Sequence, residues 1–194
     1  MFRPLLLGAS ALCISSGISS AALVLTIDIS NPSSTIITAV ANNSQITKDL
    51  AVNFLGGISF VAFFDAIEDI TVDDALQITG NWTARGTTSA YSEMVTFNYG
   101  NFQVVPGRDL SIYNLNASGS DDQNFLNTAA PFTGSSTVDF SSFASLPAAG
   151  TTGDVYSGYQ GSHGGVIGQW VVIPEPSSLL IAATGLVGLM RRRR

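Results

Sequence analysis

His163 is the single histidine of this 194-residue chain, and it lies in the segment Gly161-Ser162-His163-Gly164-Gly165. A serine–histidine–aspartate triad would have to use this residue, because the base of the triad must reach the serine hydroxyl. The surrounding glycines favour a loop, whereas a general base needs a fixed position. The segment also lacks the Gly-x-Ser-x-Gly spacing of a nucleophile elbow. We therefore predict a loop here, and a zinc site made of several imidazoles is excluded.

Carboxylates are the one kind of reactive group that the sequence offers in number. A glycoside hydrolase would need two of them about 5–9.5 Å apart across a sugar-binding cleft, and their spacing shows no such pair. The oxygen-rich segment Ser118–Asn124 would suit Ca²⁺ but does not match the EF-hand loop, so solvated acidic loops are favoured. The sequence therefore predicts no catalytic residue, no metal site and no cofactor. The carboxylates considered are Asp65, Glu68, Asp69, Asp73, Asp74, Asp121 and Asp122.

Two tryptophans could form a stacking platform for sugar rings, as in polysaccharide-binding modules. Trp170 stands inside the apolar run Val166–Ile173, which predicts a place on the core face of the last strand. Trp82 follows Gly80-Asn81 and is expected to be the more exposed of the two. Burial is nevertheless the stronger expectation for both rings.

The charge balance excludes one large class of partner. The chain has 8 Lys and Arg against 14 Asp and Glu, a formal net charge of −6. An acidic protein does not neutralise phosphates, so a nucleic-acid binder is excluded as a first interpretation. Charged residues make up 11% of the chain, well below the ~25% of a soluble domain. The excess of apolar residues lies at the two ends.

The N-terminal end is typical of a secretory signal peptide. Met1-Phe2-Arg3 is short and positive, and the apolar run Leu5–Ile14 is followed by small residues. The sequence therefore predicts a leader over residues 1–22, cleaved after Ala21 or after Ala22. Cys13, the single cysteine, would be lost with the leader, which leaves the mature chain without thiolate chemistry or disulfides.

The C-terminal end combines an apolar stretch with a basic cluster. Leu179–Met190 has no charge in twelve residues, and the four arginines Arg191, Arg192, Arg193 and Arg194 follow it. A helix of that length reaches only ~18 Å, against ~30 Å for the hydrocarbon core of a bilayer. The arginines would stay on the cytoplasmic side, so the preceding domain would lie outside. We therefore expect a temporary halt in a membrane rather than a permanent anchor.

A proline-rich tripeptide precedes this stretch. Each proline of Pro174-Glu175-Pro176 biases the residue before it toward extended backbone, and Pro176 can open the following helix. The result is an extended segment just outside the membrane, which a processing protease could bind as an added strand. The alternative is an ordinary proline-rich linker before a tail anchor.

Together, the tripeptide, the apolar segment and the arginine cluster, with a leader at the other end of the chain, resemble the tripartite sorting signal of PEP-CTERM proteins. These proteins occur in Gram-negative bacteria that make extracellular polysaccharide. The resemblance covers residues 172–194. It implies that a membrane-embedded, exosortase-like protease recognises Pro174, Glu175 and Pro176 during export, with Leu179–Met190 as the membrane segment and Arg191–Arg194 as the retention cluster. It implies no activity for the domain that the signal follows.

Residues 23–170 are predicted to form a single mainly β domain. Apolar residues alternate in Leu50-Val52-Phe54, in Ile58-Phe60-Ala62-Phe64 and in Val95-Phe97-Tyr99. Many short strands separated by Gly, Pro and Asn favour an antiparallel sandwich or jelly roll, and Ala144–Gly165 is predicted to form loops. The expected strands are Leu23–Ile29, Thr35–Ala41, Leu50–Phe54, Ile58–Phe64, Leu76–Thr83, Tyr91–Tyr99, Phe102–Val105, Leu110–Leu115, Thr137–Phe140 and Val166–Ile173.

Two classes of function follow from these features. The first is an exported, non-enzymatic protein that is held at the inner membrane as a precursor and then delivered to the cell surface or the extracellular matrix. Extracellular polysaccharide is its candidate partner, since a surface rich in Ser, Thr and Asn suits hydrated carbohydrate. The second is a carbohydrate-active enzyme or a sugar-binding module carried by the same signal.

Overall fold

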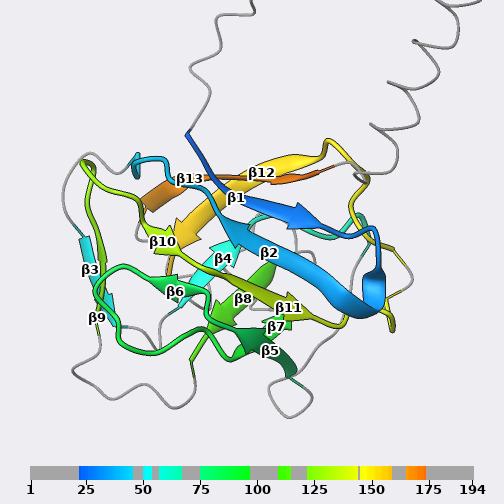
Figure 1. Cartoon of the computed structure of the whole chain (residues 1–194). Coiled ribbons are helices and arrows are strands. Elements are labelled where there is room, and N and C mark those ends of the chain that lie inside the picture. Colours follow the sequence, from blue (N-terminus) through cyan, green and yellow to red (C-terminus); the bar gives the residue numbers. More distant parts are fainter. Residues whose placement is uncertain are drawn as a thin grey trace, which may run out of the picture.

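Short strands from the whole length of the described chain close into a barrel. The computed structural model describes residues 22–45, 50–53, 57–66, 75–96, 109–114, 122–143, 145–158 and 165–173. Nine strands form the closed barrel, in the order β1-β13-β12-β4-β8-β7-β5-β11-β2 (Figure 1). Two further two-stranded sheets pair β10 with β6 and β3 with β9.

The elements have the following bounds. The strands of the barrel are β1 (Leu23–Asp28), β2 (Thr35–Ala39), β4 (Ile58–Phe60), β5 (Leu76–Gly80), β7 (Glu93–Thr96), β8 (Leu110–Tyr113), β11 (Ser135–Val138), β12 (Thr152–Ser157) and β13 (Gly165–Val172). The remaining strands are β3 (Leu50–Asn53), β6 (Thr83–Ala84), β9 (Asp122–Phe125) and β10 (Phe132–Thr133), and a 3₁₀ turn, η1, covers Pro32–Ser34.

Alternation of residues between the two faces of the sheet explains these strands. In β2, Thr35 and Ile37 are buried, whereas Ile36 and Thr38 between them are exposed. Successive side chains of a strand point to opposite faces, so one set fills the barrel and the other faces out. The prediction of a mainly β domain is confirmed.

The arrangement of the sheet differs from the predicted antiparallel sandwich or jelly roll, which is not confirmed. Neighbours in a closed ring of nine strands cannot all run antiparallel, because an odd number of directions cannot alternate around a circle. The parallel pair is β1 with β13, with Leu25 opposite Trp170 and Ile27 opposite Val172. This pair joins the first and the last described strands, so no local pattern in the sequence could predict it.

Aromatic rings fill the barrel. A barrel of eight strands is just wide enough for side chains to fill, so nine strands call for large ones. Phe60 lies 6.2 Å from both Trp82 and Trp170, measured between ring centroids, and Phe63 lies 5.2 Å from Trp170. Both tryptophans are fully buried, which confirms the expected burial of both rings and the core position of Trp170. Trp82 is not the more exposed of the two, because its ring is as fully enclosed as that of Trp170.

Two segments that were predicted as loops contain strands. Strand β12 lies within the predicted loop 144–165 and pairs with both β13 and β4. Its Gly153 falls within that predicted loop, but a Cβ atom there would lie 2.6 Å from the ring of Trp170. Strand β9 likewise includes Asp122, which was placed in an acidic loop, and its Gln123 is fully buried.

A buried polar pair ties β9 to the barrel. Tyr91 is 1% exposed, and its hydroxyl donates a hydrogen bond to Oε1 of Gln123. The side chain of Gln123 in turn donates from Nε2 to the carbonyl oxygen of Gly57 at 3.0 Å. Burial raises the pKa of Tyr91 well above its usual value.

The raised pKa of Tyr91 predicts a loss of stability in alkali. In the unfolded chain the phenol releases its proton near pH 10, whereas the folded chain retains it, so the unfolded state binds fewer protons as the pH rises. The contribution of this one group is full below pH 10 and falls by about 1.4 kcal/mol per pH unit above it. Urea denaturation at pH 9 and pH 11 measures the decline.

The variant Tyr91→Phe isolates this group. It should be less stable at pH 9 by about 1–3 kcal/mol, because the buried Oε1 of Gln123 loses a donor. Between pH 9 and pH 11 its free energy of unfolding should then fall by less than that of the wild type. The difference is the part of the decline that comes from the phenol of Tyr91. Tyr156→Phe, at a half-buried position, is the control. An equal decline in wild type and Tyr91→Phe would contradict the assignment.

Candidate functional site

The last described strand, β13, leads directly into the C-terminal segment that carries the predicted sorting motif. Strand β13 lies between β12 and β1, and its pairing continues to its end. The amide of Val172 donates to the carbonyl oxygen of Thr151, and the amide of Ile173 donates to that of Ile27, each at 2.9 Å. The chain is therefore fixed by hydrogen bonds up to the residue before Pro174.

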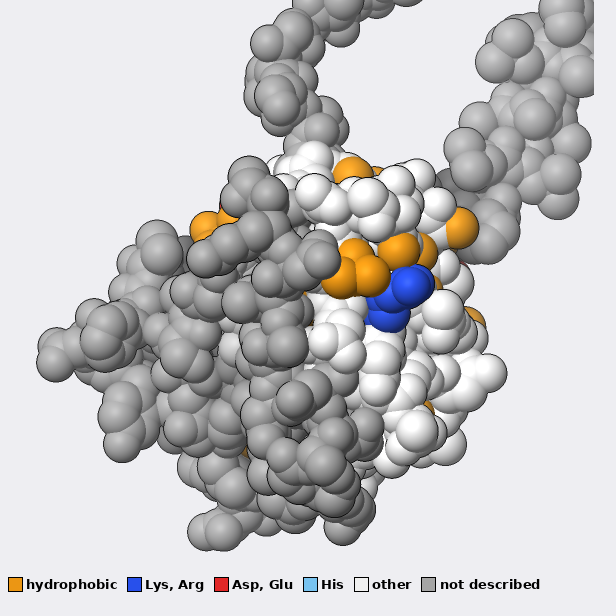
Figure 2. Space-filling model, turned by 90° about the vertical axis from the view of Figure 1, so that its left-hand side faces the viewer, with side chains coloured by type: hydrophobic (Ala, Val, Ile, Leu, Met, Phe, Trp, Pro, Cys, Tyr) orange, Lys and Arg blue, Asp and Glu red, His pale blue; other side chains and the backbone are white. Residues whose placement is uncertain are grey.

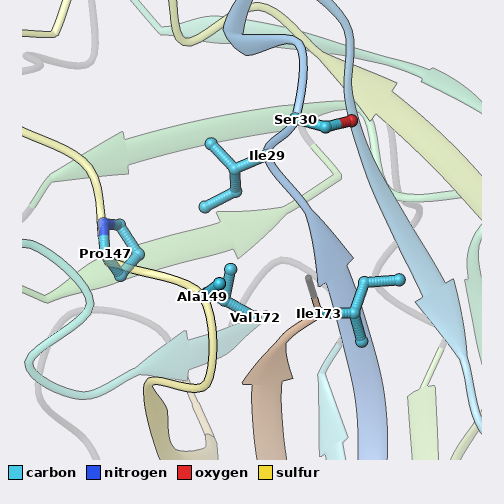
Figure 3. Close-up of a pocket in the computed structure, with 6 residues that line it drawn as sticks. All are labelled: Ile29, Ser30, Pro147, Ala149, Val172 and Ile173. Atoms are coloured by element: carbon cyan, nitrogen blue, oxygen red, sulfur yellow. The ribbon is translucent and has the colours of Figure 1, made fainter. Parts of the chain in front are cut away.

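A small pocket lies at this end of the barrel. It has a volume of about 180 Å³ and is lined by Ile29, Ser30, Pro147, Ala149, Val172 and Ile173, which we call the end pocket. Figure 3 shows the side chains of Ile29, Pro147 and Ala149 around one space, beside the end of β13. Two of the lining residues, Val172 and Ile173, thus come directly before the predicted sorting motif.

The predicted motif itself lies outside the described residues. This holds for Pro174, Glu175 and Pro176, for the membrane segment 179–190 and for Arg191, Arg192, Arg193 and Arg194. At the other end Ala21 is also outside, but Ala22 is described, and its carbonyl oxygen accepts a hydrogen bond of 2.9 Å from the amide of Gln169. Within the described part of the chain, no helix is long and apolar enough to span a membrane.

The candidate catalytic residues are not brought together among the described residues. His163 and most of the carboxylates considered lie outside them, and the side chain of Asp122 is not described. Asp65 is exposed in the turn after β4. In the segments that the structure describes, no three side chains of His, Cys, Asp or Glu gather in a group that could hold a metal ion.

Three of the described carboxylates make hydrogen bonds within turns or between paired strands. Asp28 accepts from the amide of Ser30 at 3.0 Å, and Asp154 accepts from Nε2 of Gln169 at 3.1 Å. Asp139 accepts from the amide of Ser141 at 2.8 Å, and the Ser141 hydroxyl and amide lower the pKa of this carboxyl. Their observed role is to stabilise turns and strand pairs.

One buried carboxylate had no signal in the sequence. Asp109 is 3% exposed, and it accepts a hydrogen bond of 2.8 Å from the amide of Ala62. Ala62 has a φ of 51°, a left-handed conformation that is uncommon for a residue other than glycine. Asp109 therefore stabilises the sharp turn after β4, and only the meeting of two distant segments reveals it.

The outer surface offers little charge on the face that Figure 2 shows. White atoms, which are backbone and uncharged polar side chains, dominate its coloured part, together with one blue group and some orange. Arg85 is the one basic residue among the described ranges, and it is exposed. Uncharged polar groups are thus the main chemistry of this face as far as it is described.

The described part of the chain ends at Ile173, directly before the predicted sorting motif. Residues 172–194 match the family model described as the PEP-CTERM protein-sorting motif. The resemblance inferred from the sequence is confirmed: the chain carries a PEP-CTERM sorting signal, which indicates export through the membrane and interaction with an exosortase-type processing enzyme. No curated protein and no solved structure matches the chain significantly.

Proposed function

We propose that this protein is a non-enzymatic cargo of an exosortase-like pathway, delivered to the cell surface or the extracellular matrix. The observation that carries the proposal is the match of residues 172–194 to the sorting motif. The processing enzyme would recognise Pro174, Glu175 and Pro176, while the apolar segment and the arginine cluster hold the precursor in the inner membrane. Cleavage would then release the barrel outside.

The surface of the barrel supports contact with hydrated polysaccharide. Thr38 of β2 lies opposite Thr26 of β1 on one side and opposite Ser135 of β11 on the other. Thr38 is exposed and its two neighbours are half-buried, so three hydroxyls form a row across the outer face. Such a row can exchange hydrogen bonds with sugar hydroxyls without a charged partner.

The large described aromatic residues offer less support to the alternative of a sugar-binding module. Trp82, Trp170 and Tyr91 are each at most 1% exposed, so none of them can stack on a sugar ring. A carbohydrate-active enzyme would need two facing carboxylates, whereas Asp28, Asp139 and Asp154 are engaged in the hydrogen bonds described above. Cargo without an activity is therefore the function that we favour.

Intact-mass measurement of the mature protein tests the proposed sorting. We expect a mass that corresponds to loss of the leader and of Arg191–Arg194, because cleavage near the motif removes everything after it. A mature form that keeps the four arginines would count against processing.

Replacement of Pro174, Glu175 and Pro176 by alanine tests the role of the motif. The full-length variant should stay uncleaved in the membrane fraction, because the extended tripeptide that the enzyme would bind is lost. Immunoblotting of membrane and external fractions gives the result. The double variant Ser177→Ala, Ser178→Ala is the matched control and should mature normally. Normal maturation of the triple variant would remove the motif from the proposal.

We also propose which of the two predicted cleavage sites of the leader is used. Cleavage after Ala21 would keep Ala22, whose carbonyl oxygen accepts the hydrogen bond from Gln169. Cleavage after Ala22 would remove that acceptor from the pair of β1 and β13. The same intact-mass measurement distinguishes the two forms, and we expect the chain to begin at Ala22.

A further inference from the structure

The sorting motif has no spacer between it and the barrel. The hydrogen bond from the amide of Ile173 to Ile27 fixes the chain one residue before Pro174. Three residues span at most about 11 Å, even when fully extended. An enzyme that binds Pro174-Glu175-Pro176 must therefore come within that distance of the end of β13, so it contacts the barrel as well as the peptide.

The surface that such an enzyme meets is the end pocket. Five of its six lining side chains are apolar, and Ser30 is the sixth. Ala149 and Ser30 are exposed, whereas Pro147 and Val172 are buried. Val172 and Ile173 belong both to this pocket and to the segment that matches the sorting motif. The pocket is thus continuous with the surface that the enzyme recognises.

The walls of the end pocket are held by backbone hydrogen bonds. The amide of Gly150 donates to the carbonyl oxygen of Val172 at 2.8 Å, and the amide of Thr151 donates to that of Ala148 at 3.0 Å. On the opposite side, the amide of Ser30 donates to Asp28. A partner that enters this pocket would not have to order a loop, so little affinity is lost on binding.

We propose that the end pocket is a second recognition site for the exosortase-type enzyme and receives an apolar side chain that lies next to the enzyme's peptide-binding cleft. The inference rests on the proposed function, since it needs the enzyme to bind the motif. Apolar side chains that line a concave site bind apolar groups, while the backbone and Ser30 make the rest of the exposed lining of this pocket polar. The enzyme would then read the folded barrel and the tripeptide together.

A matched pair of charge variants tests this site in the full-length precursor. Ala149→Asp places a carboxylate in the end pocket, whereas Ala148→Asp places one on the adjacent exposed residue, which does not line the pocket. We expect Ala149→Asp to slow maturation by at least about tenfold, the factor that corresponds to 1.4 kcal/mol of lost binding. Ala148→Asp should mature at the wild-type rate. Pulse-chase labelling in a host that carries the processing enzyme measures both rates.

The outcomes separate this inference from the proposed function. Equal rates for the two variants, whether fast or slow, would overturn the role of the pocket, because the added charge is the same. If Ala149→Asp lowers the melting temperature, Ala149→Leu decides the matter, since it fills the pocket without charge and should also slow maturation. The triple alanine variant of the motif tests the proposed function by itself. A blocked triple variant with a normally processed Ala149→Leu would leave the function standing and the pocket refuted.

Discussion

Replacement of Gly57 by alanine is expected to unfold the barrel. Gly57 has a φ of 57°, and a Cβ atom added there would overlap the carbonyl oxygen of Ile112 and lie 2.9 Å from its carbonyl carbon. These are backbone atoms of β8, so no side chain can turn away to make room. The carbonyl oxygen of Gly57 also accepts hydrogen bonds from Gly158 and Gln123, so the residue cannot move without breaking them.

We expect Gly57→Ala to cost more than about 4 kcal/mol, the range in which single substitutions destroy small domains. Circular dichroism and urea denaturation measure the loss. Gly150→Ala is the matched control, because Gly150 also has a positive φ, of 87°, but its added Cβ would meet no atom within 4 Å. The control should show only the backbone strain of about 1–2 kcal/mol. Similar losses in both variants would show that strain, not the clash with β8, governs Gly57.

Truncation of Trp170 to alanine is expected to have the second largest effect, a loss of about 3–5 kcal/mol. The ring is fully buried, is stacked at 6.2 Å on Phe60 and lies 5.2 Å from Phe63. Its removal leaves a cavity in the core beside β12 and β13. The close-packed side chains around this cavity cannot refill it. Trp170→Phe should lose less, because a smaller ring still occupies the space.

A double-mutant cycle with Gly153 sharpens this prediction. Gly153 lies directly opposite Trp170, and a Cβ atom there would lie 2.6 Å from the indole ring. Gly153→Ala should therefore destabilise the wild type but cost little in the Trp170→Ala background, where the ring is gone. Urea denaturation of the four proteins gives the coupling energy. Additive losses would contradict the packing of this ring on β12.

These variants also bear on the sorting step, because they leave residues 172–194 unchanged. If the processing enzyme contacts the folded end of the barrel, Gly57→Ala should slow maturation although the motif is intact. Motif recognition by the peptide alone would leave the rate of cleavage unaffected.

Local patterns in the sequence were sufficient to predict several elements. Strands β1, β2 and β8 fall inside the predicted ranges. In β2 the alternating residues reflect a sheet with one buried face, whereas β8 is a short, mostly apolar segment that is buried throughout. Strand β12 escaped prediction because its Gly153 and Ser157 resemble loop residues, although a tryptophan ring covers one and the other is fully buried. The end pocket could not be predicted either, since its lining comes from three separate segments.

The sequence by itself determined the sorting signal of this protein, because such a signal is a contiguous segment. Its proline, apolar and basic parts can be recognised without knowledge of the fold. The sequence also determined that the domain is made of strands, since alternation is a property of neighbours in the chain. Only the tertiary structure decided that the sheet closes through a parallel pair of β1 and β13 and that a pocket adjoins the motif. Each of these depends on contacts between residues far apart in the chain, whose free energies are gained only when the barrel closes.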